Sequence, residues 1–301
     1  KGRFPIYILF FDIDPERIPI AQGLLEKAGQ KKAETYTDGE FAYRKLLTRG
    51  DLDCVIVSTP WLWHFPMAVD AMKLQVPVAT EVSGAASVQE CWDLVEVHEN
   101  TGTPFFFLEN VCYRRDVMAV LNMIRRGIFG DLIHCRCGYQ HDLREVKFQP
   151  GAEFGGKGIH EARWRTEQSV KRNGDLYPTH GAGPVAMFLD INRGNRFVTL
   201  TSMATSPSGL HDYVLKTGGA SHPNARIDFQ LGDVVTSLIK CANGQTVLVT
   251  HDTNLPRPYS LGFDVHGSRG IWNHDSGRIY LEGTSPEPHE WEPDASYLSR
   301  Y

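Results

Sequence analysis

The chain has 301 residues, of which 42% are hydrophobic and 22% are charged, and this composition excludes wholesale disorder. The formal net charge of −5, with no run rich in lysine or arginine, argues against a protein that binds nucleic acid or an anionic membrane surface. No apolar run approaches the roughly 20 residues of a membrane span, so we expect a soluble protein. The sequence does not indicate whether it is cytoplasmic or exported.

Residues 1–112 alternate short apolar runs with amphipathic stretches. The apolar runs lack alternation, which is typical of parallel strands covered on both faces. The resulting β-α-β order predicts an α/β fold with a doubly wound, Rossmann-like parallel sheet. The expected strands are 6–11, 34–36, 54–58, 76–80 and 105–108, and the expected helices are 15–28, 39–48, 65–74 and 87–100.

The pattern changes after a helix expected at 115–127. Strand-like runs joined by glycine- or asparagine-containing turns predict that residues 113–301 form an α/β domain with a mainly antiparallel sheet. Residues 142–176 are polar and irregular, as functional segments and lids often are, and residues after 284 are expected to be an extended surface segment. The expected strands are 134–139, 197–203, 225–230, 234–241, 246–253 and 261–267.

The six cysteines are scattered along the chain. Cys135 and Cys137 alternate in a strand-like run, so their side chains are expected on one face of a sheet. No second pair of cysteines or histidines accompanies them at the spacing of a zinc site, so we expect structural thiols and no metal.

Asp12 closes the first predicted strand. In dinucleotide-binding folds an acid after a strand accepts hydrogen bonds from the adenosine ribose, and its charge would repel the 2′-phosphate of NADP, so NAD is favoured. The alternative is a helix cap, a role for which Asp14 is better placed. No G-x-G-x-x-G motif occurs, and only five residues precede Ile6. We therefore expect a partial dinucleotide-binding domain without its first, central strand and glycine loop, with both flanking strand edges exposed.

Four segments carry a resemblance to a known family: Trp61-Leu62-Trp63-His64, Ala79-Thr80-Glu81-Val82, the run 108–115 around Asn110, and the run 174–180, which ends in Tyr177-Pro178-Thr179-His180. They resemble the NAD-dependent glycoside hydrolases of family 109, α-N-acetylgalactosaminidases within the Gfo/Idh/MocA oxidoreductase superfamily. That superfamily carries Glu-Lys-Pro where this chain has Glu81-Val82-Ser83, so the catalytic lysine of ordinary sugar dehydrogenases is missing. The resemblance also implies that the chain is truncated at both ends.

The resemblance implies two sets of site residues. Cofactor contacts are implied for Asp12, Trp61, Leu62, Trp63, His64, Glu81, Val82 and Asn110. Sugar contacts are implied for Tyr139, Arg165, Tyr177, Pro178, Thr179, His180 and Tyr259.

The chemistry implied by this family differs from that of ordinary glycosidases. Those enzymes use two carboxylates beside the scissile bond, and no such pair stands out in residues 113–301. The family is understood to use bound NAD, which takes a hydride from C3 of the sugar and so acidifies the C2 proton. Elimination at C1, addition of water and return of the hydride complete the reaction.

Such a route needs groups that move protons at the C3 hydroxyl and at C2. Tyr177 and His180 are three residues apart, share a face at helical spacing and are expected to handle these protons, with Asp175 capping the turn. Tyr139 and Arg165 are expected to position the sugar, although the two tyrosines could exchange roles, which makes Tyr139 a third catalytic candidate.

Each of these residues also has a structural alternative. His180 could be a hydrogen-bonded core histidine, Tyr139 a half-buried aromatic residue and Arg165 half of a surface ion pair, while Trp61 and Trp63 could pack at a domain interface. Two other functions stay open as well. One is an NAD-dependent sugar or polyol dehydrogenase, and the other is an inactive, truncated sugar-binding relative. The expected partner is a glycan with terminal N-acetylgalactosamine, and a homodimer is expected by analogy only.

Overall fold

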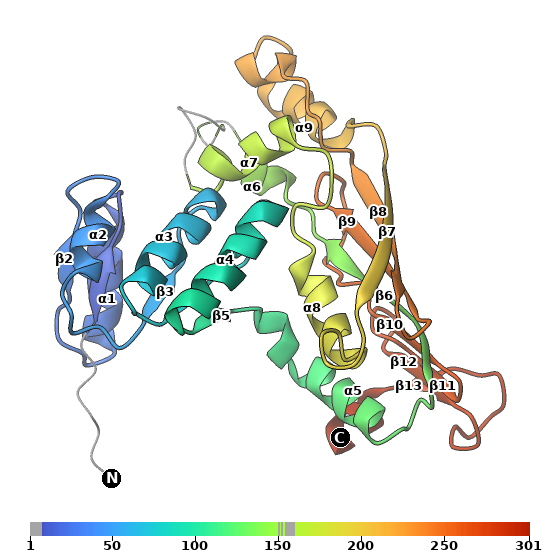
Figure 1. Cartoon of the computed structure of the whole chain (residues 1–301). Helices are drawn as coiled ribbons and strands as arrows, with labels where there is room; N and C mark the ends of the chain where they lie inside the picture. The colour runs from blue at the N-terminus through green and yellow to red at the C-terminus, as the bar shows by residue number, and fades with distance from the viewer. Residues whose placement is uncertain (1–7, 150, 152, 154–159) are drawn as a thin grey trace. The chain divides into compact units, whose positions relative to one another are not determined.

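The computed structural model describes residues 8–149, 151, 153 and 160–301. Two compact units, Lys1–Leu108 and Glu109–Tyr301, make up the chain, and each is described by itself (Figure 1). The domain boundary predicted after residue 112 stays a prediction, because compactness alone does not define a domain. Among the described residues, no helix is long and apolar enough to cross a membrane.

The first unit has the predicted alternation of parallel strands and helices. No hydrogen-bonded ladder joins β1 (Leu9–Phe11) to β3 (Val55–Val57) in the described part of the unit, as expected for a parallel sheet without its central strand. Its strands are β1 (Leu9–Phe11), β2 (Glu34–Tyr36), β3 (Val55–Val57), β4 (Val78–Thr80) and β5 (Phe105–Phe107), paired as a β1-β2 sheet and a β3-β4-β5 sheet. Its helices are α1 (Arg17–Lys27), α2 (Ala42–Leu47), α3 (Trp61–Lys73) and α4 (Val88–Thr101).

Local sequence signals set several of these helix ends. The Ser87 side chain accepts a hydrogen bond from Glu90 N at 3.2 Å, and the Glu90 carboxylate accepts one from Ala86 N at 2.6 Å. This resembles a capping box at the start of α4, with the carboxylate bonded one residue before the N-cap. Gly102, with a φ of +68°, ends the same helix. Helix α1 begins at Arg17 rather than at the predicted Pro15.

The second unit is built on one eight-stranded sheet, as the mainly antiparallel prediction required. Every neighbouring pair is antiparallel except β6 (Leu132–Gln140) and β9 (Thr246–Asp252), which run parallel with Cys137 opposite Val249. In spatial order the strands are β13 (Glu292–Pro293), β12 (Arg278–Leu281), β11 (Gly270–Asn273), β10 (Asp264–Gly267), β6 (Leu132–Gln140), β9 (Thr246–Asp252), β8 (Val234–Cys241) and β7 (Phe197–Ala204).

Two helices cover one face of this sheet around β6 (Figure 1). Cys135 and Cys137 are both buried there, which confirms that they share a face, and they pack in one core with Val120 of α5 and Val185 of α8. The helical segments of the unit are η1 (Asn110–Tyr113), α5 (Arg115–Arg125), α6 (Arg144–Lys147), α7 (Ala162–Lys171), α8 (Thr179–Phe188), α9 (Gly209–Gly218), η3 (Pro223–Arg226) and α10 (Ala295–Arg300).

Three predictions for this unit are wrong. The strand expected at 225–230 is absent, because the chain there turns through η3 and continues without strand pairing. The segment 142–176 contains α6 and α7, and α7 escaped prediction because it buries Thr166, Gln168 and Ser169 rather than an apolar stripe. The tail after 284 is not simply extended, since it contains β13 and α10. Within the segment 142–176, residues 150, 152 and 154–159 lie outside the described residues.

Candidate active site

Helix α8 and strand β6 approach each other through glycines. A Cβ added to Gly181 would lie 2.5 Å from Gly138 N, and one added to Gly138 would collide with the carbonyl oxygen of Thr250 on β9. Only glycine lets three backbones meet so closely. Tyr139 and His180, each next to one of these glycines, are therefore held together, with ring centroids 5.4 Å apart at 72°.

Tyr177 completes an aromatic cluster with these two side chains. Its ring centroid lies 4.8 Å from that of Tyr139 and 4.8 Å from that of His180. Tyr177 precedes the helix, because α8 begins at Thr179 with Pro178 as an N-cap that makes no side-chain hydrogen bond. Asp175 is therefore not the expected helix cap; its Oδ1 instead accepts from Tyr177 N at 2.8 Å and fixes the turn before α8.

His180 is paired with an acid that sequence patterns did not predict. Its Nδ1 lies 2.7 Å from Oε1 of Glu109, and the two side chains are only 15% and 7% exposed. Glu109 is fixed in turn, since Oε1 also accepts from Val111 N at 3.0 Å. A Cβ on Gly183 would lie 2.9 Å from the Glu109 Cγ, so glycine at that position makes room for the acid. With Nδ1 held by a carboxylate, Nε2 is the nitrogen left for a substrate.

Buried polar atoms without partners gather at this cluster. Among the described residues, Glu109 Oε2, Asp175 Oδ2 and Thr179 Oγ1 are buried without a hydrogen-bond partner. Burial raises the pKa of Asp175 to about 6, despite the hydrogen bond from Tyr177 N. Buried polar groups normally find partners, so these atoms fit a site whose hydrogen bonds are completed by a polar ligand.

Arg165 lies beside the cluster, and it also forms an ion pair with the half-exposed Glu161. Its side chain is 12% exposed, its Nε lies 2.8 Å from Oε2 of Glu161, and its Cζ lies 5.5 Å from the centre of the Tyr177 ring. Burial raises the pKa of the Tyr139 phenol, and the Arg165 guanidinium opposes that rise. Tyr139 is thus a protonated phenol at neutral pH with a cation nearby.

Tyr259 and His141 border the same cluster. The Tyr139 hydroxyl lies 3.1 Å from Nδ1 of His141, and the His141 ring meets Tyr259 edge to face with centroids 5.0 Å apart. Tyr259 is 47% exposed, so one side of its ring is open to solvent. His141 was not predicted, although its place two residues after Tyr139 in a strand-like run was a usable signal.

The predicted cofactor residues of the first unit follow strand ends. Asp12 comes directly after β1 and its Oδ1 accepts from Asp14 N at 2.9 Å, which orients the carboxylate. Glu81 comes directly after β4, the strand that ends at Thr80, whose buried Oγ1 lacks a partner in the described structure. An acid after one strand and an unpaired buried hydroxyl at the end of another fit a ligand bound at these strand ends.

Other predicted cofactor residues also make structural contacts within the first unit. His64 is buried, with its ring nitrogens 2.7 Å from Ser83 O and 2.6 Å from Thr59 O, so it ties together the segments after β4 and β3. Trp63 packs edge to face on Phe41 with centroids 5.8 Å apart. Three further residues vary in exposure, as Trp61 and Val82 are buried and Leu62 is 52% exposed. Asn110, the first residue of η1, is exposed in the second unit.

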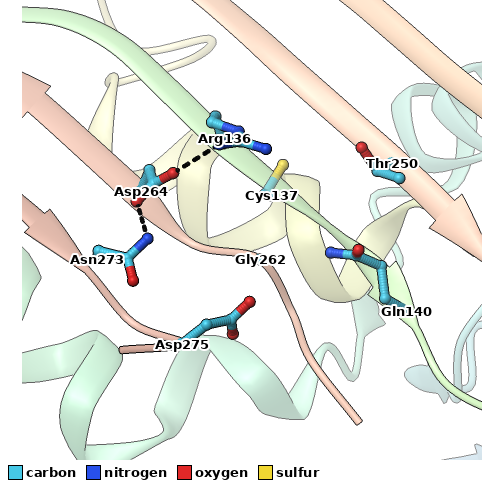
Figure 2. Close-up of a pocket in the computed structure, with 8 residues that line it drawn as sticks. All are labelled: Arg136, Cys137, Gln140, Thr250, Gly262, Asp264, Asn273 and Asp275. Carbon is cyan, nitrogen blue, oxygen red and sulfur yellow. Dashed lines mark hydrogen bonds and ion pairs between the residues drawn. The ribbon is translucent and has the colours of Figure 1, made fainter. Parts of the chain in front are cut away.

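A polar recess on the second unit lies away from the aromatic cluster. Arg136 and Tyr139 are an odd number of positions apart on β6, so their side chains leave opposite faces of the sheet. The acids of the recess have partners, since Asp264 Oδ2 lies 3.2 Å from Arg136 Nη1 and Asp275 accepts from Ser260 Oγ at 2.6 Å. Figure 2 shows its lining residues, Arg136, Cys137, Gln140, Thr250, Gly262, Asp264, Asn273 and Asp275. Across the described ranges, no group of three or more metal-ligating side chains occurs.

Comparison with known proteins decides the family. Residues 113–301 match a model of the glycosyl hydrolase 109 C-terminal domain. The chain belongs to glycosyl hydrolase family 109. It is 55% identical over 301 residues to an alpha-N-acetylgalactosaminidase of Tannerella forsythia, a match that covers 96% of this chain and 64% of the relative. It is 52% identical over 280 residues to a glycosyl hydrolase family 109 protein of Parabacteroides distasonis, covering 89% and 60%. The chain spans about three fifths of the length of these relatives.

The fold of this family 109 chain is shared with sugar dehydrogenases. A levoglucosan dehydrogenase in complex with NADH and levoglucosan matches with a TM-score of 0.70 at 16% identity, covering 94% of this chain and 69% of the other. An inositol dehydrogenase homolog from Azotobacter vinelandii, complexed with NAD+, matches with a TM-score of 0.64 at 19% identity, covering 94% and 69%. The Rossmann-like and antiparallel architecture predicted from sequence is thereby confirmed.

Proposed function

We propose that the protein is an NAD-dependent glycosidase that releases terminal N-acetylgalactosamine. The observation that carries the proposal is the Glu109–His180 pair at 2.7 Å, set beside Tyr139 and Tyr177 in a member of glycosyl hydrolase family 109. Identity of 55% to an enzyme named alpha-N-acetylgalactosaminidase supports the substrate. Asp12, with its carboxylate oriented after β1, supports NAD over NADP.

NAD, when bound, would accept a hydride from C3 of the sugar and return it at the end of the cycle. His180 Nε2 takes the proton of the C3 hydroxyl, and the Glu109 carboxylate on Nδ1 stabilises the imidazolium that forms. A phenol of Tyr139 or Tyr177 exchanges the C2 proton, which the C3 ketone has made acidic. Arg165, Thr179 and the open ring of Tyr259 hold the sugar through its hydroxyl groups, acetamide and apolar face.

The arrangement does not depend on a pair of acids across the scissile bond. The carboxyl groups at and beside the described cluster are Glu109, which is bound to His180, Asp175, whose Oδ1 accepts from Tyr177 N, and Glu161, which is paired with Arg165. A retaining or inverting glycosidase needs one carboxyl as acid and another as nucleophile or base on opposite sides of the sugar. Redox-assisted elimination fits the side chains that are present.

The experiment that tests this proposal measures cofactor turnover and sugar release together. The full product of the gene that encodes this chain is freed of nucleotide, then given a nitrophenyl α-N-acetylgalactosaminide with or without NAD. We expect release of nitrophenol that requires NAD in catalytic amounts, with no accumulation of NADH. Stoichiometric NADH without release would indicate a sugar dehydrogenase, and release independent of NAD would overturn the proposal.

A further inference from the structure

The hydrogen bond between Tyr139 and His141 is built into the end of β6. Their side chains are two positions apart and leave the same face of the strand. The backbone beyond β6 is held extended, because His141 N donates to Asp252 O at 2.9 Å and Gln140 forms a bridge with Ser260. The Tyr139 hydroxyl then lies 3.1 Å from His141 Nδ1, with the two rings at 88°.

The surroundings of this pair keep the phenol protonated and the imidazole neutral. Burial, and then the Arg165 guanidinium, lower the pKa of His141, while Asp142 acts in the opposite direction. Asp142 is itself held by Arg144, whose Nη2 lies 2.8 Å from Oδ2, so its charge is shared with another cation. Burial raises the pKa of Tyr139. At neutral pH a protonated phenol therefore faces a neutral imidazole, and in the tautomer that carries its hydrogen on Nε2 the phenol donates to Nδ1.

We propose that His141 is a positioning residue that takes the phenolic proton of Tyr139 when Tyr139 removes the C2 proton of the sugar. This inference rests on the proposed function and deepens it, because it selects Tyr139 rather than Tyr177 as the phenol that works at C2. Nothing in the family match or in the names of the relatives assigns a role to this histidine.

The proton transfers balance within the pair. The C2–H bond breaks and its electron pair forms the C1–C2 double bond as the C1 substituent leaves, after oxidation at C3 by the nicotinamide cofactor. The C2 proton bonds to the Tyr139 oxygen, and the proton already on that oxygen moves to His141 Nδ1. The C1 substituent leaves with the bonding electron pair, and its oxygen takes up the proton that water loses when water adds at C1. Tyr139 and His141 exchange their protons with solvent in between, so the proton that Tyr139 returns to C2 comes from solvent, and His141 returns to its neutral form.

This arrangement avoids a free phenolate. A tyrosine whose pKa is raised by burial is seldom ionised near pH 7, so it is a poor base by itself. A neutral histidine that accepts the phenolic proton lowers the free-energy barrier of each transfer, because the phenol oxygen loses one proton as it gains another and never becomes a free phenolate. The nearby Arg165 guanidinium disfavours a lasting imidazolium and so drives the return of the proton.

The test compares His141→Ala and His141→Gln in the full gene product. We expect kcat to fall on the order of 10²-fold, KM to change less than about threefold, and imidazole added to His141→Ala to restore activity about tenfold or more. Tyr139→Phe combined with His141→Ala should be no slower than Tyr139→Phe alone and should not respond to imidazole. The control is His134→Ala on the same strand, where the ring contacts Thr246 instead.

Two outcomes would overturn the inference. One is wild-type kcat in both His141 variants, and the other is a loss that imidazole does not restore and that adds to the loss from Tyr139→Phe. Nitrogen NMR of histidine gives a readout that needs no turnover: the spectrum should show His141 Nδ1 unprotonated in the wild type and shifted in Tyr139→Phe. If the spectrum behaves so but no NAD-dependent release occurs, the proposed function fails while the hydrogen-bonded pair stands.

Discussion

Glu109 and His180 are 71 positions apart in the chain, yet their side chains meet at 2.7 Å in the interior of the second unit. The contact joins the residue before η1 to the first turn of α8, and Gly183 leaves the space that the acid occupies. A histidine held by a buried acid in this way has one free nitrogen, a fixed tautomer and a stabilised cationic form. These are the properties that a base at the C3 hydroxyl requires.

Replacement of Glu109 tests that pairing. Glu109→Gln should lower kcat on the order of 10²-fold, because the amide cannot stabilise the imidazolium of His180. Binding of NAD, measured by calorimetry, should stay within about twofold of the wild-type value. Glu290→Gln, at an exposed position, is the matched control. Undiminished turnover in Glu109→Gln would contradict the role given to the pair.

The glycine contact between α8 and β6 makes a prediction about stability. Gly181→Ala should lower the free energy of unfolding by about 1–3 kcal/mol, since the added Cβ would meet the backbone of Gly138 and no flexible side chain can yield. The measurement is chemical unfolding followed by circular dichroism. Gly174→Ala serves as the control, because no atom lies within 4 Å of its added Cβ. Equal stability of the two variants would show that the contact is looser than described.

The buried carboxyl of Asp175 predicts a pH-dependent stability difference. Its pKa is raised from 3.8 to about 6 in the folded protein, so the folded state holds the proton more tightly than the unfolded state. Its contribution to stability is therefore greatest below about pH 4 and decreases as the pH rises to about 6. Asp175→Asn keeps the acceptor for Tyr177 N and removes the ionisation. The variant should gain about 2 kcal/mol relative to wild type between pH 4 and pH 7.5, and a pH-independent difference would reject this account.

The proposed preference for NAD can be tested at Asp12. Asp12→Ala should weaken NAD binding by about tenfold, the value of a charge-assisted hydrogen bond to a ribose, and should reduce discrimination against NADP. Calorimetry with each nucleotide on the full gene product measures both effects. The exposed Asp53→Ala provides the control. Unchanged NAD affinity in Asp12→Ala would remove the support that Asp12 gives to NAD.

Local patterns were sufficient for much of the fold. Unbroken apolar runs such as that around Val57 predicted parallel strands, and the alternation at Cys135 and Cys137 predicted a shared buried face. The short strands β11 and β12 span four residues each, too few for their alternation to stand out. Helix α7 could not be found by periodicity, because apart from Ala162 its buried residues are polar.

The candidate site was predictable only in part, for a physical reason. Tyr177 and His180 were predicted as site residues from a segment that resembles family 109, and the structure brings their ring centroids to 4.8 Å. Glu109 and His141 were not predicted, because the role of each depends on a partner that only the fold brings into contact. For Glu109 that partner is His180, 71 positions further along the chain. Gly138 and Gly181 have no functional side chain, so the sequence does not mark them as important. Their role becomes clear only from the close approach of the α8 and β6 backbones in the structure.

The most direct test of the central claim is the fate of the C2 hydrogen. N-acetylgalactosaminide is hydrolysed in heavy water by the full gene product with NAD, and the released sugar is analysed by mass spectrometry and proton NMR. Elimination and addition require the C2 proton to leave and a proton to return from a base in exchange with solvent, so the released sugar should carry deuterium at C2. Product that keeps hydrogen at C2, with no rate decrease for substrate deuterated at C2 or C3 and no need for NAD, would contradict the account and indicate direct displacement by carboxylates.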